Sequence, residues 1–394
     1  MAPAAGEGRV TRFATWEWVM DRKTAVVVGS LGVIGRNFVA HLEDMPEWDI
    51  VGLSRRRPDF PTRARAISVD LLDPADCEAK LGDLTEATHV FYCAFQARPT
   101  WAEHNAPNLA MLANSVSAIE AVAPDLERVV LLEGNKIYGS HLGPFKTPAK
   151  ESDPPHMLPN FYYDQEQWLR QRQAGKPWSY TALRPHTVCG FSVGSPMNIT
   201  TVIAVYAAIS KELGLPLRFP GKRGAYEAVY QVTDSEHLAR AMLWAGTAPS
   251  AANEVFNVTN TDFFRWCNIW PRIAEVFDMP VGPVQTIRLT EFMADKGPLW
   301  ADIQRRHELQ SIPYEDLVAW PFGDYVFGTD WDVMRHPQDP AGRVHRGRGF
   351  RADAARHPVG PARASRRAVT GAPRVYRRAP PVLPRARQPG GDGT

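Results

Sequence analysis

The stretch that decides the fold is Val26-Val27-Val28-Gly29-Ser30-Leu31-Gly32-Val33-Ile34-Gly35, in which an apolar run breaks into three glycines at fixed spacing. An apolar strand followed by such a turn and a helix predicts a nucleotide loop, because the helix N-terminus offers unpaired N–H groups to a pyrophosphate. A tight strand-to-helix turn that binds nothing is the alternative. The residues expected to contact or shape a dinucleotide site are Gly29, Leu31, Gly32, Val33, Ile34 and Gly35.

Outward from this stretch, short apolar runs alternate with helical patterns, which is typical of βαβ units around a parallel sheet. Strands are predicted over residues 25–28, 49–53, 66–69, 89–94, 128–132, 179–183 and 254–258. Apolar residues recur every three or four positions over 109–122, and further helices are predicted over 199–213 and after Asp234, which would cap the last one. The predicted fold class is α/β, a Rossmann-type doubly wound parallel sheet with a smaller C-terminal substrate-capping part.

The sequence predicts four parts. Residues 1–21 form a loosely ordered leader, with Met20 as an alternative start site. Residues 22–190 form the nucleotide-binding core, and residues 191–334 form the capping part with a strand returning to the core. Residues 335–394 contain fourteen Arg, no Lys and a single Leu, so this tail is expected to be disordered. Its composition favours a frameshift near Met334, and an Arg-rich arm that binds nucleic acid or acidic surfaces is the alternative.

Composition narrows the class of protein. The 394 residues are 44% hydrophobic and 22% charged, which suits a soluble chain with a proper core. The net charge of +2 is the sum of +11 on residues 335–394 and −9 on residues 1–334. The acidic first 334 residues therefore give no electrostatic reason to expect that they bind nucleic acid. The four cysteines lie far apart without a CxxC pair, which argues against a metal site. Without a membrane span or a secretory signal, a cytoplasmic location is expected.

The end of the second predicted strand indicates which dinucleotide binds. Ser54-Arg55-Arg56-Arg57 stands where an NAD-specific fold would place a carboxylate for the ribose hydroxyls. Guanidinium groups bind a 2′-phosphate through charge-assisted, bidentate hydrogen bonds, so NADP(H) is the predicted cofactor. A solvated surface run of arginines is the alternative. Asp70, at the end of the third strand, would suit the adenine amine.

Reductases of this general architecture commonly polarise the substrate oxygen with a tyrosine whose acidity is raised by a lysine four residues later. This sequence has no such pair, because none of its eleven tyrosines has a lysine at that position. Lys136 is the candidate cation, since it follows the fifth predicted strand and should face the carboxyl edge of the sheet. A solvated loop lysine is the alternative.

Three motifs are similar to one known family: Gly134-Asn135-Lys136, Asn160-Phe161-Tyr162-Tyr163-Asp164, and Arg184-Pro185-His186-Thr187-Val188-Cys189-Gly190-Phe191-Ser192. With other ordered matches between residues 24 and 334, they resemble the progesterone 5-beta-reductase and iridoid-synthase-like family of extended short-chain dehydrogenases. The resemblance implies hydride transfer from NADPH to an activated carbon–carbon double bond beside a carbonyl, with tyrosine and lysine stabilising the enolate.

Carried over by motif, the second tyrosine of NFYYD, Tyr163, becomes the catalytic tyrosine, and Lys136 replaces the missing helical lysine. Two helix aromatics without a catalytic role are the alternative for Tyr162 and Tyr163. Arg55 and Arg56 match the phosphate-binding arginines. The cofactor contacts expected outside the glycine loop are Ser54, Arg55, Arg56, Asp70 and Val188.

An apolar substrate pocket is expected from Phe95, Tyr138, Phe145, Met197 and Asn198, with ordinary core packing as the alternative. Phe95 stands where many plant relatives carry Trp, so the resemblance carries over the reaction type and not a steroid or iridoid substrate. The expected partners are a small-molecule enone and, in a homodimer, a second copy of the chain. The competing functions are an NAD(P)-dependent carbonyl reductase or epimerase, and a non-catalytic NADP-sensing protein.

Overall fold

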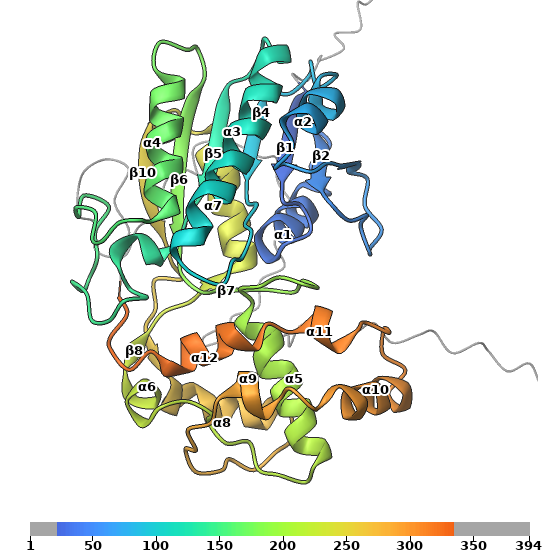
Figure 1. Cartoon of the computed structure of the whole chain (residues 1–394), viewed down its shortest axis with the longest axis vertical. Coiled ribbons are helices and arrows are strands. Elements are labelled where there is room, and N and C mark those ends of the chain that lie inside the picture. Colours follow the sequence, from blue (N-terminus) through green and yellow to red (C-terminus); the bar gives the residue numbers. More distant parts are fainter. Residues whose placement is uncertain (1–21, 335–394) are drawn as a thin grey trace, which may run out of the picture.

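Alternating side chains of the first strand decide how the sheet is covered. In β1 (Lys23–Val28), Val26 and Val28 enter one apolar cluster, and Ala25 and Val27 enter another. Because successive side chains of a strand point to opposite faces, β1 requires apolar cover on both sides. The computed structural model describes residues 22–334 and places helices on both faces (Figure 1). The expectations for residues 1–21 and 335–394, including the start site and the frameshift, lie outside the described residues.

A seven-stranded sheet forms the core of the first part of the chain, in the order β10-β6-β5-β4-β1-β2-β3, and each neighbouring pair is parallel. The strands after β1 are β2 (Trp48–Ser54), β3 (Arg65–Ser68), β4 (His89–Tyr92), β5 (Arg128–Leu132), β6 (Ser179–Pro185) and β10 (Glu254–Val258). Each overlaps a predicted strand, so the predicted doubly wound parallel sheet is confirmed.

Helices cover the two faces separately. One face carries α2 (Pro74–Leu81), α3 (Asn105–Val122) and α4 (Phe161–Gln173), and the other carries α1 (Val33–Leu42) and α7 (Ser235–Thr247). Three short 3₁₀ helices, η1 (Ala102–His104), η2 (Asn135–Tyr138) and η3 (Pro249–Ala251), lie in the connections. As predicted, Asp234 caps α7, because its side chain accepts a hydrogen bond of 2.9 Å from the backbone N–H of His237.

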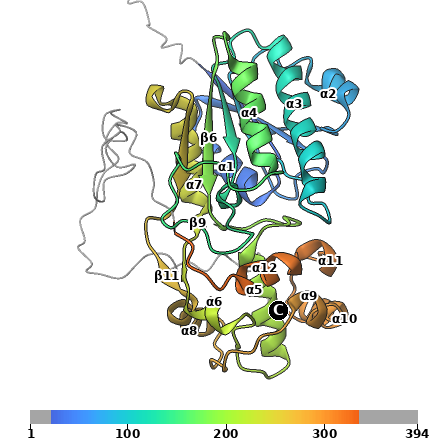
Figure 2. The same ribbon diagram turned by 60° about the vertical axis from the view of Figure 1, so that its left-hand side comes forward.

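A second part lies beyond the carboxyl edge of the sheet and has its own apolar core (Figures 1 and 2). Its helices are α5 (Ile199–Glu212), α6 (Arg223–Glu227), α8 (Trp266–Val276), α9 (Leu289–Phe292), α10 (Gly297–Arg306), α11 (Tyr314–Leu317) and α12 (Trp320–Gly328). Two short strand pairs accompany them: β7 (Val188–Cys189) with β9 (Thr233–Asp234), and β8 (Val229–Tyr230) with β11 (Phe264–Arg265). Trp270, Phe219 and Phe327 are almost fully buried in this core.

The chain crosses between the two parts more than once. It leaves the sheet after β6, enters the second part at α5, and returns to cover and extend the sheet with α7 and β10 before α8 begins. Within residues 22–334, no helix is long and apolar enough to cross a bilayer. The same range contains no cluster of His, Cys, Asp and Glu suited to hold a metal ion.

Candidate active site

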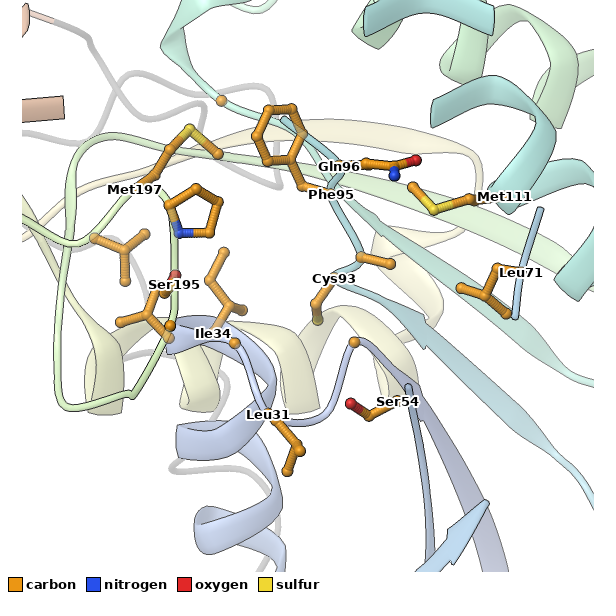
Figure 3. Close-up of a pocket in the computed structure, with 18 of the residues that line it drawn as sticks. Leu31, Ile34, Ser54, Leu71, Cys93, Phe95, Gln96, Met111, Ser195 and Met197 are labelled. Carbon is orange, nitrogen blue, oxygen red and sulfur yellow. The ribbon is translucent and has the colours of Figure 1, made fainter. Parts of the chain in front are cut away.

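A cavity of about 500 Å³ lies at the carboxyl ends of β1, β2 and β4, where the sheet faces the second part. This is the point at which the strand order reverses, the usual ligand position in a doubly wound sheet. In Figure 3, the glycine loop and α1 with Ile34 form one side. The segment carrying Ser195 and Met197 lies opposite the segment after β4 with Cys93, Phe95 and Gln96.

The glycine loop is shaped to admit a pyrophosphate. Gly29 has a φ of +84°, and a Cβ there would lie 2.8 Å from the backbone of Ala94. A Cβ on Gly35 would overlap the carbonyl oxygen of Gly29, so Gly35 packs beneath the loop and outside the cavity lining. Helix α1 begins after Gly32 without a side-chain cap, so its first N–H groups can serve an anion. The loop residues that line the cavity are Gly29, Leu31, Gly32, Val33 and Ile34.

A second group of lining residues comes from the loops after β2 and β3. Arg55 and Arg56 are exposed to solvent while lining the cavity, and the backbone N–H of Arg56 donates to the Oγ of Ser54 over 3.3 Å. The Asp70 carboxylate accepts a hydrogen bond of 3.0 Å from the backbone N–H of Leu72. The structure thus brings the cofactor contacts predicted outside the glycine loop, Val188 of β7 among them, to the same cavity as that loop: Ser54, Arg55, Arg56, Asp70 and Val188.

Lys136, on η2 directly after β5, lines the same cavity. Its Nζ lies 5.3 Å from the ring centroid of Trp101 and 5.0 Å from that of Tyr325. Burial lowers the pKa of Lys136 to about 8, because the ammonium ion loses solvating water. The two aromatic faces partly compensate that loss, so a lightly solvated cation is held against the cavity.

The structure separates the two tyrosines of the NFYYD motif. Tyr163, the predicted catalytic residue, lies outside the cavity lining, and its hydroxyl donates to the backbone carbonyl of Ile137 over 2.5 Å. Tyr162 is 6% exposed and lines the cavity. A Cβ on Gly134 would lie 3.1 Å from the hydroxyl oxygen of Tyr162, so this glycine makes room for that hydroxyl beside the Lys136 loop.

Helix geometry explains why Tyr162 faces the site. Asn160 caps α4 by accepting from the backbone N–H of Tyr162, which sets where the helix begins. The buried residues of α4 are Phe161, Tyr162, Gln165, Glu166 and Leu169, a spacing that places Tyr162 on the face toward the sheet. Burial also raises the pKa of Tyr162. Its phenol therefore stays protonated at neutral pH and can donate a hydrogen bond.

The predicted apolar wall is present in part. Phe95 and Met197 line the cavity, and Figure 3 shows the Met197 side chain directed toward Phe95. Two further lining residues, Phe322 and Tyr325, come from α12. Sequence reasoning missed them because no motif connects this late segment with the site, and only the packing of the second part brings it there.

Three predicted wall residues lie outside the lining because other contacts hold them. The hydroxyl of Tyr138 donates to the Oδ1 of Asn257 over 2.8 Å. Asn198 caps α5 by accepting from the N–H of Thr200, and its amide donates to the carbonyl oxygen of Gly190 over 3.1 Å. Phe145 packs against the edges of two apolar clusters.

A buried ionic group joins the residue after β5 to β6 and α4, and its Glu133 lines the same cavity as Lys136. Arg184 donates to Glu133 and to Glu166, each over 2.7 Å, and all three side chains are less than a tenth exposed. Burial raises the pKa of Glu133, while the adjacent Arg184 guanidinium acts in the opposite direction. Glu166 stands four residues after Tyr162, where the catalytic lysine of many short-chain reductases would be. The group therefore fixes the helix that carries Tyr162 against the sheet.

A dinucleotide loop at the switch point of a doubly wound sheet, closed by a separate capping part, defines an extended short-chain dehydrogenase/reductase. Two solved structures share this fold. UDP-glucose 4-epimerase from Thermus thermophilus, solved in complex with NAD, is 20% identical with a TM-score of 0.53, covering 69% of this chain and 92% of that one. RMD from Pseudomonas aeruginosa, complexed with NADPH, is 19% identical with a TM-score of 0.53, covering 68% and 85%.

The family model of the PRISE-like Rossmann-fold domain matches residues 67–339, and the chain belongs to this family. A curated relative, (S)-8-oxocitronellyl enol synthase of Nepeta cataria, is 38% identical over 340 residues, covering 80% of this chain and 86% of the relative. The 3-oxo-Delta(4,5)-steroid 5-beta-reductase of Arabidopsis thaliana is 34% identical over 327 residues, covering 78% and 83%. The predicted family and the prediction of an oxidoreductase are both confirmed.

Proposed function

We propose that this protein is an NADPH-dependent reductase of carbon–carbon double bonds conjugated to a carbonyl group. The observation that carries the proposal is the single cavity that joins the glycine loop and Arg55 and Arg56 to Lys136 and Tyr162. Relatives named as an enol synthase and as a steroid 5-beta-reductase support this class of reaction. Structures of the same fold with NAD and with NADPH support a nicotinamide cofactor.

The choice of the phosphorylated cofactor depends on charge at the adenosine end. Two exposed guanidinium groups, those of Arg55 and Arg56, follow β2 and line the cavity. They favour a 2′-phosphate through charge-assisted hydrogen bonds, whereas a carboxylate at this position would repel it. NADPH should therefore bind more tightly than NADH.

The residues at the other end suit a developing oxyanion. When bound, the cofactor supplies a hydride to the β-carbon of the enone and becomes NADP⁺. The Lys136 ammonium and the Tyr162 hydroxyl then stabilise the negative charge on the substrate carbonyl oxygen in a site with little water. A proton from solvent reaches the α-carbon, so the double bond gains one hydride and one proton and the carbonyl is restored.

We assign the hydroxyl donor to Tyr162 in place of Tyr163. Tyr162 lines the cavity, while the Tyr163 hydroxyl is engaged by the carbonyl of Ile137. Both side chains stand at the start of α4, so substituting either one removes the same hydroxyl group from the same turn. The pair therefore offers a matched comparison.

The proposal is tested by incubating the purified protein with NADPH and a panel of linear and cyclic enones. Each enone is paired with its saturated ketone, and products are identified by mass spectrometry. We expect NADPH oxidation with the enone and a product saturated at the double bond. NADH should support a lower kcat/KM.

Lys136→Met should abolish most of this turnover while NADPH still binds. Lys176→Met, at a surface lysine that pairs with Glu120, is the matched control and should behave as wild type. Reduction of the saturated ketone to an alcohol, with the enone double bond left intact, would instead establish a carbonyl reductase.

A further inference from the structure

We propose that Arg56 is a positioning residue that couples the 2′-phosphate end of the cavity to its substrate wall, so that a phosphorylated cofactor tightens substrate binding. The wall in question is the segment of residues 191–197, called the wall segment below. Its last four residues, Gly194, Ser195, Pro196 and Met197, line the cavity. This inference rests on the function proposed above.

A direct contact joins Arg56 to the wall segment. The Nη2 of Arg56 donates to the backbone carbonyl oxygen of Val193 over 3.0 Å, across 137 residues of sequence. The next residue, Gly194, has a φ of +69°, and a Cβ there would lie 3.0 Å from the Nη1 of Arg56. The guanidinium group therefore lies against the backbone just before Ser195.

The start of the wall segment is attached to the cofactor side by independent contacts. The Nδ2 of Asn37, on α1, donates to the carbonyl oxygen of Phe191 over 3.2 Å. The guanidinium carbon of Arg36 lies 4.0 Å from the ring centroid of Phe60 and 4.8 Å from that of Phe191. The Arg36 guanidinium also forms a salt bridge of 2.7 Å with Asp59.

The end of the segment is fixed by α5. Asn198 caps that helix, and its amide donates to the Ser192 hydroxyl over 3.1 Å. Arg56 thus holds the middle of a segment whose two ends are already fixed. Met197, at the end of the segment, lies across the cavity from Phe95 (Figure 3).

The guanidinium group can serve both sides at once. It carries five N–H donors in a planar fork, and one of them is directed to Val193. The others remain available for a phosphate on the solvent side. Without such an anion, a hydrogen bond from an exposed side chain contributes little to order, because water competes and the side chain loses rotamer freedom.

A bound 2′-phosphate would hold Arg56 in place and so order the wall segment. The substrate then meets a wall that is already arranged, and less of its binding free energy is lost in ordering it. Linkage requires the reverse effect as well, so substrate must tighten NADPH by the same factor. We expect each ligand to increase the affinity for the other by roughly fivefold or more, which is the lower end of typical coupling between sites.

Hydrogen exchange of the full chain, read by mass spectrometry on peptides covering residues 190–198, tests the inference without turnover. Saturating NADPH should slow exchange in the wall segment relative to saturating NADH. The enone KM should be at least fivefold lower with NADPH than with NADH. Equal exchange and equal KM with the two cofactors would overturn the coupling while leaving a functional reductase.

Three variants separate coupling from simple phosphate binding. Arg56→Lys keeps a positive charge but lacks the fork, so it should weaken NADPH binding and, even at saturating NADPH, lose the protection of the wall segment. Arg55→Ala should weaken NADPH yet keep the protection at saturation. Gly194→Ala strains the segment against Arg56 and should raise the enone KM with little change in the NADPH Kd.

If Arg56→Lys preserves the NADPH-dependent protection, the positioning role is wrong. If wild-type protein binds NADPH without reducing any enone, the proposed function fails and the exchange result still decides the coupling. If it binds no NADPH, both proposals are overturned.

Discussion

The hydroxyl of Tyr163 donates a hydrogen bond of 2.5 Å to the backbone carbonyl oxygen of Ile137, the residue that follows Lys136. The Tyr163 hydroxyl is thus used in a hydrogen bond outside the cavity lining, whereas the adjacent Tyr162 lines the cavity. Tyr162→Phe should therefore lower kcat by roughly 100-fold, the scale for loss of one oxyanion donor, with the NADPH Kd unchanged.

Tyr163→Phe is the control for that experiment, because it removes a hydroxyl from the same turn of α4. It should keep kcat within a few fold and cost about 1 kcal/mol of unfolding free energy through the lost hydrogen bond. Steady-state kinetics and urea unfolding of both variants check the assignment. A larger loss of kcat in Tyr163→Phe would return the catalytic role to Tyr163.

The activity should depend on pH through Lys136. Burial lowers the pKa of Lys136 to about 8, so the ammonium is lost as the pH rises through that value. We expect kcat/KM for the enone to fall above about pH 8. In Lys136→Arg the fall should move to higher pH, since guanidinium stays protonated, and a profile that is flat between pH 7 and 10 in the wild type would contradict this role.

The same burial has a consequence for stability. The folded pKa of Lys136 is about 8 and the ordinary value is 10.5, so the unfolded chain binds more protons between these pH values. The buried ammonium therefore destabilises the fold below about pH 8, and this penalty disappears as the pH rises toward 10.5. Lys136→Met should raise the unfolding free energy by about 1–2 kcal/mol at pH 7.

The gain from Lys136→Met should shrink as the pH approaches 10.5, and Lys176→Met should show no such gain. Urea unfolding at several pH values measures both. A variant that is less stable than the wild type at pH 7 would mean that the contacts with Trp101 and Tyr325 outweigh the loss of hydration.

Removing the Arg184 side chain should lower the unfolding free energy more than removing any partner of an exposed ion pair. Its side chain is 6% exposed and pairs with the buried Glu133 and Glu166, so Arg184→Met leaves Glu133 without this cation and leaves Glu166 only its pair with Arg170. We expect a loss of about 3–5 kcal/mol of unfolding free energy. Arg223→Met is the matched control, because its pair with Glu227 is 75% and 54% exposed and should change stability by less than about 1 kcal/mol.

The sheet was predictable because its strands, apart from the exposed edge strand β3, are short, mainly apolar runs between turn residues, and β5 and β10 begin and end where the sequence predicts. That the residues expected to bind the cofactor line one cavity was predictable for a related reason. The glycine loop and the arginines after β2 follow their strands directly, so the parallel sheet brings them to one edge. Local sequence is sufficient to predict such a grouping when the parallel sheet itself brings the ends of the strands to the same edge.

The choice between Tyr162 and Tyr163 depends on which face of α4 meets the sheet. Adjacent helix positions differ in direction by about 100°, so the motif alone does not identify the inward one. The buried spacing of Tyr162, Gln165, Glu166 and Leu169 was a usable signal, but two of these residues are polar. Their burial follows from tertiary partners such as Arg184.

Phe322 and Tyr325 could not be predicted because α12 reaches the cavity only through the packing of the second part. Conversely, Tyr138 and Asn198 stand next to recognisable motifs, yet their polar groups are used to hold Asn257 and the start of α5. Proximity in sequence to a site is a weak guide when the side chain has a competing structural partner.

The position of Tyr325 on the last described helix also determines when the site can first exist during synthesis. A chain emerging from the ribosome exposes the glycine loop and β1 to β6 long before β10, and α12 follows later still. A nascent chain can therefore form the cofactor loop while one side of Lys136 is still open to water. The complete cavity, and with it the ability to turn over substrate, can form only when almost all of the described chain has been translated.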